Sequence, residues 1–219
     1  MATKDVLETL CGQYQTANGT PVQVTSIGGV DAAKRVRAGE ITDVVVLASN
    51  TIEQLIAEGH LLAASRKDLV KSGIAVAVKE GAAKPDLRNA MEVRDAVLAA
   101  KTISYSTGPS GVYLEKLFSQ WGIFETIASR IIQAPPGVPV GQLVATGKAE
   151  LGFQQLAELM HVRGITLLGP LPSDIQLITT FSAGIATTCV LPVAAKALID
   201  FLSSEQSADA KRQAGMQAA

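Results

Sequence analysis

The sequence predicts an α/β protein with open, mainly parallel sheets that carry helices on both faces. The first indication is composition: 47% of the 219 residues are hydrophobic but only 4% are aromatic. Ala, Val, Leu and Ile dominate, and buried parallel strands have this makeup. The second indication is a regular alternation of strand-like and helix-like segments, which is typical of open parallel sheets. The third is that polar turns follow several predicted strands, where such sheets bind ligands.

The first elements follow from the spacing of apolar residues and from the glycines that end them. Val6, Leu7, Leu10 and Tyr14 have helical spacing, and Asn18-Gly19 closes that helix. The run DVVVL, rich in β-branched residues, is typical of a buried parallel strand. We expect helices over 5–14, 31–38 and 51–58, and strands over 21–26, 43–47 and 74–78.

A loop over 81–86 introduces the second section, in which strands and helices again alternate. The chain ends with two helical segments that follow the last strand. We expect strands over 102–105, 130–133, 150–153, 165–168 and 179–187, and helices over 89–100, 112–121, 140–146, 192–202 and 207–214.

Charge and motif content exclude several classes of function. The formal net charge is −1 and aromatic residues are few, which argues against a nucleic-acid surface. Cys11 and Cys189 are too few for a disulfide framework and are expected as free thiols, although they could pair. His60 and His161 have no companions at metal-ligand spacing. No phosphate-binding, dinucleotide-binding or nucleophile-elbow motif occurs, so no metal and no cofactor is predicted.

Three polar turns follow predicted strands and are the candidate ligand contacts. Ser26 precedes Gly28-Gly29, and glycines with helix-start N–H groups suit an anion, although an ordinary tight turn would look the same. The segment 106–111 (STGPSG) offers hydroxyls at a helix start, where Ser110 could simply be the N-cap. Gln154-Gln155 is either a ligand-binding amide pair or a solvated pair at a strand end. Tyr105 is expected to form part of the wall rather than to be a catalyst.

Four stretches in this order resemble the molybdate-binding-like type II periplasmic binding proteins, a family of substrate-binding proteins for ABC transporters. They are VTSIGGVDAAKRVRAGEITDVVVLA, YSTGPSGVYLEKLF, VPVGQLVATGKAELGFQQ and TTFSAGIATT. The resemblance covers nearly the whole chain and implies two α/β lobes, joined by two crossing strands, with a ligand cleft between them. Lobe one would comprise 1–79 and 177–219, and lobe two 80–176.

The resemblance also implies which residues contact the ligand. Val138 and Val140 match a part of the family where only a backbone amide faces the ligand, and Gln154-Gln155 stands where molybdate binders commonly have a tyrosine. An amide pair suits a carboxylate as well as an oxyanion, so molybdate itself is less favoured. The candidate ligand-binding residues are Thr3, Ser26, Gly28, Ser106, Ser110, Gly111, Val138, Gln154 and Gln155.

The start of the sequence departs from the family. Relatives begin with a β-strand before the helix that matches 5–14, whereas this sequence starts at Met1-Ala2-Thr3. We therefore expect that a first strand is missing from the given sequence. As written, without a secretory leader, the sequence predicts a cytoplasmic protein; a trimmed start would predict a periplasmic one.

Two functions of different classes follow. The first is a substrate-binding protein, expected to be a monomer, that captures a small anion (organic carboxylate or oxyanion) by hinge closure, with an ABC permease as partner in an exporting organism. The second, implied by the branch of the family that includes aconitate isomerase, is a cofactor-free isomerase of an unsaturated organic acid. It would move an allylic proton between cis and trans forms, and the sequence identifies no catalytic residue for it.

Overall fold

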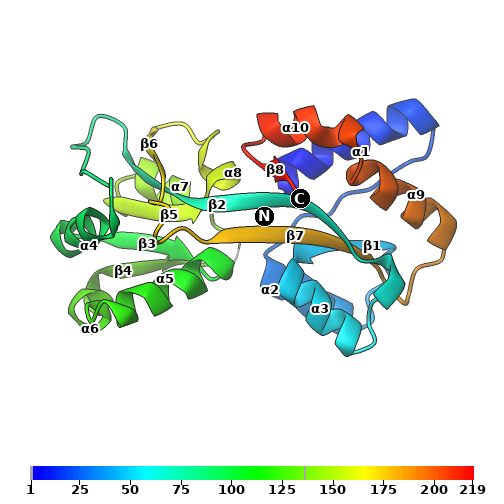
Figure 1. Ribbon diagram of the computed structural model, residues 1–219, viewed down its shortest axis with the longest axis horizontal. Helices are drawn as coiled ribbons and strands as arrows, with labels where there is room; N and C mark the ends of the chain where they lie inside the picture. Colours follow the sequence, from blue (N-terminus) through cyan, green and yellow to red (C-terminus); the bar gives the residue numbers. More distant parts are fainter. Residues whose placement is uncertain (1, 136) are drawn as a thin grey trace. The chain divides into compact units, whose positions relative to one another are not determined.

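The computed structural model describes residues 2–135 and 137–219, which fold as two compact α/β units. Unit 1 runs up to Ser72 and resumes at Thr179, and unit 2 is Gly73–Ile178. The sequence-based lobe boundaries were 79/80 and 176/177. Strands β2 (Lys67–Lys79) and β7 (Ile178–Ile185) are the elements that pass from one unit to the other (Figure 1). Among the described helices, none combines the length and the apolar character that crossing a bilayer requires.

The sheet of unit 1 contains β1 (Val44–Ala48), β7, the first part of β2, and the short β8 (Gln217–Ala218). Strand β1 pairs with β7 in antiparallel register, with Val46 opposite Ala183. The strand predicted over 43–47 is therefore confirmed in position, but its expected parallel pairing is wrong. Its neighbour β7 returns from unit 2 and enters the sheet in the opposite direction.

Helices cover this sheet. Ala33 and Val36 of α2 (Gly29–Arg37) and Ile52 of α3 (Ser49–Ala57) pack with Val45 and Leu47 of β1. The remaining helices are α1 (Lys4–Asn18), α9 (Pro192–Leu202) and α10 (Ala208–Gln213), with short 3-10 turns at Ala63–Ser65 and Glu205–Ser207. The rings of Tyr14 and Phe201, 5.3 Å apart, join α1 to α9.

The strand predicted over 21–26 does not form, although the residues keep a strand-like pattern. Val22, Val24 and Ser26 are half-buried, and Gln23 and Thr25 between them are exposed. A strand also needs a neighbour that completes its hydrogen bonds. Within the described residues, the segment pairs with no strand, and the edge of β1 that faces away from β7 is also unpaired. The expected additional first strand stays a prediction.

The sheet of unit 2 combines parallel and antiparallel pairs. Strand β3 (Ile103–Ser106) is parallel to both β4 (Ile131–Ala134) and β5 (Leu151–Gln155). The second part of β2 is antiparallel to β5 and to β6 (Ile165–Pro170). The hydrogen-bonded order of the strands is β1-β7-β2-β5-β3-β4. One path includes strands of both units because β2, with 13 residues, contributes to both. The expectation of mainly parallel sheets is thus corrected, because most of the described strand pairs are antiparallel.

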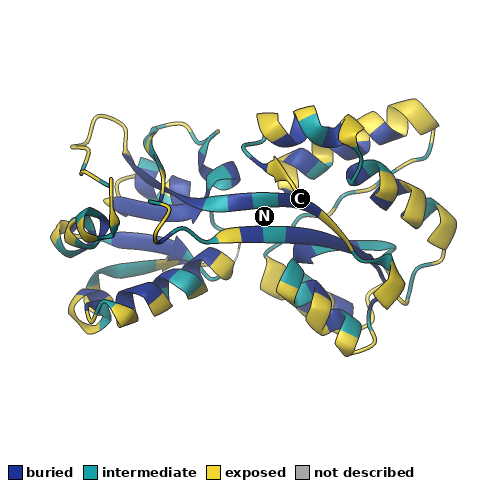
Figure 2. Cartoon of the chain, in the orientation of Figure 1, coloured by how far each residue is buried: buried dark blue, intermediate teal, exposed yellow. Residues whose placement is uncertain are grey.

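The core of unit 2 lies between this sheet and its helices, and the strands are its most buried part (Figure 2). Phe118 of α5 (Pro109–Gln120) contacts Tyr105, Trp121 and Phe153 through tilted or edge-on ring pairs. Asn89 caps α4 (Ala90–Ala99) by accepting a hydrogen bond from the Glu92 amide. The shorter helices are α6 (Phe124–Ile127), α7 (Val140–Ala145) and α8 (Leu156–Leu159), with a 3-10 turn at Ala128–Arg130.

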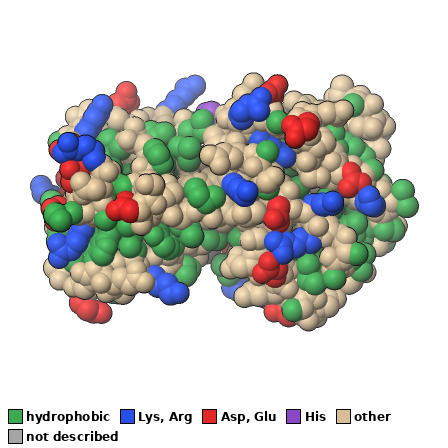
Figure 3. All heavy atoms as spheres, in the orientation of Figure 1, with side chains coloured by type: hydrophobic (Ala, Val, Ile, Leu, Met, Phe, Trp, Pro, Cys, Tyr) green, Lys and Arg blue, Asp and Glu red, His purple; other side chains and the backbone are tan. Residues whose placement is uncertain are grey.

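Acidic and basic side chains are interspersed on the visible face of each unit (Figure 3). This distribution agrees with the formal net charge of −1. It has none of the one-sided basic character that a phosphate backbone requires.

Candidate functional site

In unit 2, three parallel strands end at one edge of the sheet. Tyr105 of β3 lies opposite Phe153 of β5, and Ser106 of β3 lies opposite Ala134 of β4. The chain leaves this edge toward α5 after β3, toward α7 after β4, and into α8 after β5. This is the edge at which open α/β sheets bind ligands.

The turn between β3 and α5 is fixed by its own hydrogen bonds. The Gly108 N–H donates to Ser106 Oγ (3.3 Å), and the Val112 N–H donates to the Gly108 carbonyl (3.1 Å). Gly108 is the N-cap and Pro109 the first helical residue, so the prediction that Ser110 could be the N-cap is wrong. A proline at that position, with its restricted φ, suits a helix start, and it moves Ser110 into the first turn.

Neutral donors are available at the start of α5. Pro109 has no N–H, and the N–H groups of Ser110 and Gly111 belong to the first turn, which finds no partner within the helix. Ser110 is 1% exposed, and its hydroxyl makes no hydrogen bond to any described residue. The helix is twelve residues long, so the positive end of its dipole lies at the same place. The arrangement can hold an anion without a Lys or Arg side chain.

Gln154 and Gln155 are the last residues of β5 rather than the residues that follow it. They are 3% and 2% exposed, which rules out a solvated pair at a strand end. Gln154 Oε1 accepts a hydrogen bond from the Val140 N–H (3.0 Å), and the Gln154 side chain also bonds Glu158. The structure therefore places the Gln154 amide inside unit 2, and its assignment as a ligand contact stays a prediction. Gln155 is the N-cap residue of α8.

The backbone amides expected from Val138 and Val140 are already engaged. The Val138 N–H donates to the Pro135 carbonyl (3.0 Å), and the Val140 N–H is held by Gln154. The Gln154 side chain and the turn after β4 thus occupy both donors in this structure, and the expectation that they face a ligand stays a prediction. Residue 136, in the predicted Pro-Pro-Gly segment, lies outside the described residues.

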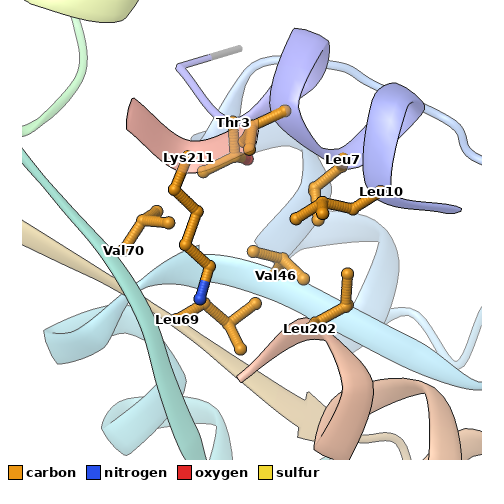
Figure 4. Close-up of a pocket in the computed structure, with 9 residues that line it drawn as sticks. Thr3, Leu7, Leu10, Val46, Leu69, Val70, Leu202 and Lys211 are labelled. Atoms are coloured by element: carbon orange, nitrogen blue, oxygen red, sulfur yellow. The ribbon is translucent and has the colours of Figure 1, made fainter. Parts of the chain in front are cut away.

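The remaining candidates belong to unit 1. Ser26 is half-buried in the extended segment before α2, and Gly28 is the N-cap of α2, where its carbonyl accepts from the Ala32 N–H (2.9 Å). Thr3 is 8% exposed and lines a small, mainly apolar cavity beneath α1. The Lys211 side chain reaches into the same cavity beside Leu69 and Val70 (Figure 4). Thr3 thus contributes to packing in unit 1.

Several hydrogen bonds of tyrosine and carboxylate side chains near α5 were not predicted. Tyr105 forms a hydrogen bond with Glu115, and burial and this carboxylate together raise the pKa of the Tyr105 phenol well above its usual range. Gln133 Nε2 donates to Glu115 Oε1 (3.2 Å), and Tyr113 OH donates to the Ile175 carbonyl (2.8 Å). Tyr105 is a buried, protonated phenol, and its expected role as part of the wall of a site stays a prediction. The i to i+10 spacing of Tyr105 and Glu115 gives no local signal in the sequence.

The remaining titratable groups include two histidines and two cysteines. Within the described ranges, no group of three His, Cys, Asp or Glu side chains is arranged to hold a metal ion. Cys11 and Cys189 are free thiols, and burial raises the pKa of Cys11. Their prediction as unpaired thiols is confirmed.

Comparison with known proteins agrees with this architecture. The chain is 35% identical over 209 residues to an aconitate isomerase from a Pseudomonas species, covering 93% of this chain and 79% of that protein. The periplasmic molybdate-binding protein of Azotobacter vinelandii has a similar structure, with a TM-score of 0.80 and 20% identity over 98% of this chain and 95% of that one. A tungstate ABC transporter protein from Geobacter sulfurreducens gives a TM-score of 0.76 and 16% identity over 97% and 95% of the two chains.

The two structural likenesses establish the fold and confirm the type II binding-protein architecture predicted from the four sequence stretches. The model of the bacterial extracellular solute-binding protein family matches residues 1–217. That match spans both units and every candidate site residue. The chain therefore belongs to the family of bacterial extracellular solute-binding proteins.

Proposed function

We propose that the protein binds a small anion, an organic carboxylate or an inorganic oxyanion, at the start of α5. The observation that carries the proposal is the set of neutral donors at Ser110 and Gly111: their first-turn N–H groups and the hydroxyl of Ser110, a residue that is 1% exposed and whose hydroxyl makes no hydrogen bond to a described residue. Hydrogen bonds to a charged group contribute about 1.5–3 kcal/mol each. Two or three such bonds, with the helix dipole, suffice for a specific site without a cationic side chain.

A thermal-shift screen tests this proposal. Molybdate, tungstate, sulfate, citrate and the two aconitate isomers are each added to the wild type and to Ser110→Ala. A ligand at about a hundredfold excess over Kd adds roughly 2.7 kcal/mol to the free energy of unfolding. We expect at least one anion to raise the melting temperature of the wild type, and to raise that of Ser110→Ala less. If no anion stabilises the wild type, the proposal is wrong.

A second candidate function is favoured by the 35% identity to an aconitate isomerase over 93% of the chain. In this case the protein isomerises an unsaturated tricarboxylic acid. A base removes a proton from the CH2 carbon, the double bond moves toward that carbon, and a proton is delivered to the other end of the allylic system. The reaction is balanced without a cofactor or co-reactant.

Proton NMR in D2O separates the two candidates. An isomerase converts trans-aconitate into its cis form, or the reverse, faster than the protein-free control and incorporates deuterium at the allylic carbon. A binding protein shows saturable line broadening of the added acid without conversion. Conversion at the spontaneous rate would rule out the isomerase.

The partner and the compartment are further proposals. The solute-binding family and the similarity to a tungstate ABC transporter protein support an ABC permease as partner. A periplasmic or extracellular location would agree with that partner, and fractionation of the native organism tests it. Sedimentation equilibrium tests the predicted monomer.

A further inference from the structure

The first amide of α7 is satisfied by a side chain from β5. Val140 is the first residue of α7, and the N–H groups in the first turn of a helix normally lack an internal partner. Here the Val140 N–H donates to Gln154 Oε1 at 3.0 Å, and both residues are buried. Gln154 therefore removes a donor that would otherwise be available.

Both ends of the Gln154 amide are engaged. Because Oε1 accepts from Val140, the NH2 group is the end that remains for Glu158. Burial raises the pKa of the Glu158 carboxyl, and the hydrogen bond with Gln154 opposes that effect. The amide is thereby fixed in one orientation and has no freedom to turn its NH2 group toward Val140.

Close packing holds the start of α7 against β5. A Cβ atom on Gly152 would lie 2.4 Å from Val144 Cγ2 and 3.0 Å from Val140 Cγ1. The glycine thus allows α7 to approach the strand that carries Gln154. The 3.0 Å hydrogen bond belongs to this tightly packed contact.

Helix α7, which begins at Val140, follows its strand on the same edge of the sheet as α5. Strand β4 leads to α7 and strand β3 leads to α5, and Ser106 and Ala134 are paired at the ends of these two parallel strands. Donors at the starts of both helices therefore belong to one edge. Of these, α5 keeps its Ser110 and Gly111 donors, whereas α7 has its first amide occupied.

We propose that Gln154 determines specificity: by occupying the Val140 amide, it favours a carboxylate over a tetrahedral oxyanion. The inference rests on the proposed function, because it concerns the same edge of unit 2. A tetrahedral oxyanion presents oxygens in four directions and needs donors around it. A carboxylate presents two oxygens in one plane, which the Ser110 and Gly111 donors can satisfy.

Replacing Gln154 by Leu tests the inference, because Leu removes the acceptor and releases the Val140 N–H. The matched control is Glu158→Gln, which alters the other partner of Gln154 and leaves the Val140 hydrogen bond in place. Isothermal titration with molybdate and with trans-aconitate gives the ratio of the two dissociation constants for the wild type and each variant. Gln154→Met, of similar length and also without an amide, replaces the Leu variant if circular dichroism shows that the latter does not fold.

In Gln154→Leu we expect the affinity for molybdate to rise relative to that for trans-aconitate by about tenfold or more, because the anion gains one hydrogen bond. In Glu158→Gln the ratio of the two dissociation constants should stay at the wild-type value. An unchanged ratio in the Gln154 variants, or an equal change in the control, overturns the inference while the wild type still binds an anion. Failure of the wild type to bind any of the anions instead overturns the proposed function and this inference with it.

Discussion

A Cβ atom on Gly111 would lie 1.6 Å from the carbonyl oxygen of Ser106, which is well inside the contact distance of the two atoms. The end of β3 therefore folds directly onto the first turn of α5, and only glycine allows this approach. The same Cβ would lie 3.1 Å from the Tyr105 ring. The position of the donors at Ser110 and Gly111 depends on this contact.

Gly111→Ala should consequently move the 106–110 turn away from α5. We expect a loss of about 1–3 kcal/mol in the free energy of unfolding, typical of overpacking, together with loss of anion binding. Urea denaturation and calorimetric titration measure the two effects. Gly12→Ala in α1 is the control, because nothing lies within 4 Å of its added Cβ, and this variant should be at least as stable as the wild type. Wild-type binding by Gly111→Ala would contradict the close-approach argument.

Ser110→Ala should weaken anion binding roughly tenfold to a hundredfold and leave the fold intact, because one hydroxyl donor to a charged ligand is lost. Ser119→Ala is the matched control on the same helix. The Ser119 hydroxyl is exposed and donates to the Glu115 carbonyl (2.7 Å), so its removal should not change the affinity. The same titration of Ser26→Ala tests the sequence-based prediction that Ser26 contacts the ligand. Equal affinity in Ser110→Ala and the wild type would place the site elsewhere.

Burial of Lys211 should make the free energy of unfolding vary with pH in the alkaline range. The side chain is 2% exposed, and burial lowers its pKa, an effect that Glu205 partly opposes. The folded chain then loses this proton at a lower pH than the unfolded chain, whose lysine has a pKa of about 10.4. The destabilising effect is fully present below the lowered pKa and disappears as the pH rises toward the unfolded value.

Lys211→Met should therefore be more stable than the wild type near neutral pH, and the difference should narrow as the pH rises toward 10. Guanidinium denaturation at a series of pH values measures it. Lys148→Met, at an exposed position, is the control and should show no such narrowing. A stability difference that is independent of pH would mean that Lys211 is not desolvated as described.

The open edge of β1 should accept a further strand. We expect that a segment of about ten residues with alternating apolar side chains, placed ahead of Met1, raises the melting temperature by several degrees. Hydrogen exchange at the Val44–Ala48 amides should slow at the same time, because the unpaired edge would gain hydrogen bonds. A Gly/Ser segment of equal length is the control. An equal melting temperature for both extended chains would show that the β1 edge takes no added strand.

The sequence predicted what depends on local periodicity. The helix over 192–202 has the expected bounds, and the strand predicted over 150–153 is found at Leu151–Gln155. Which strands pair with each other could not be predicted from such patterns. The segment 21–26 alternates as a strand would but pairs with no strand of the described residues, and β1 pairs with β7, more than 130 residues later in the sequence.

For the candidate site, glycine, proline and serine indicated a helix start after β3. The helix begins at Pro109, three residues before the predicted start at Val112. The sequence did not reveal how Gln154 is used. That side chain is fourteen residues from Val140, and a hydrogen bond over this separation depends on how α7 packs on β5. From sequence alone, a polar residue at a strand end is predicted to be either solvated or ligand-binding, because the packing around it is not known.

The central claim is that the donors at the start of α5 hold the anion, and an amide-resolved NMR titration tests it most directly. The 15N-labelled wild type is titrated with trans-aconitate and, separately, with molybdate. We predict that the Ser110 and Gly111 amide resonances shift in a saturable way with the anion that binds. Saturable binding that leaves both amides unmoved while resonances elsewhere shift would contradict the claim.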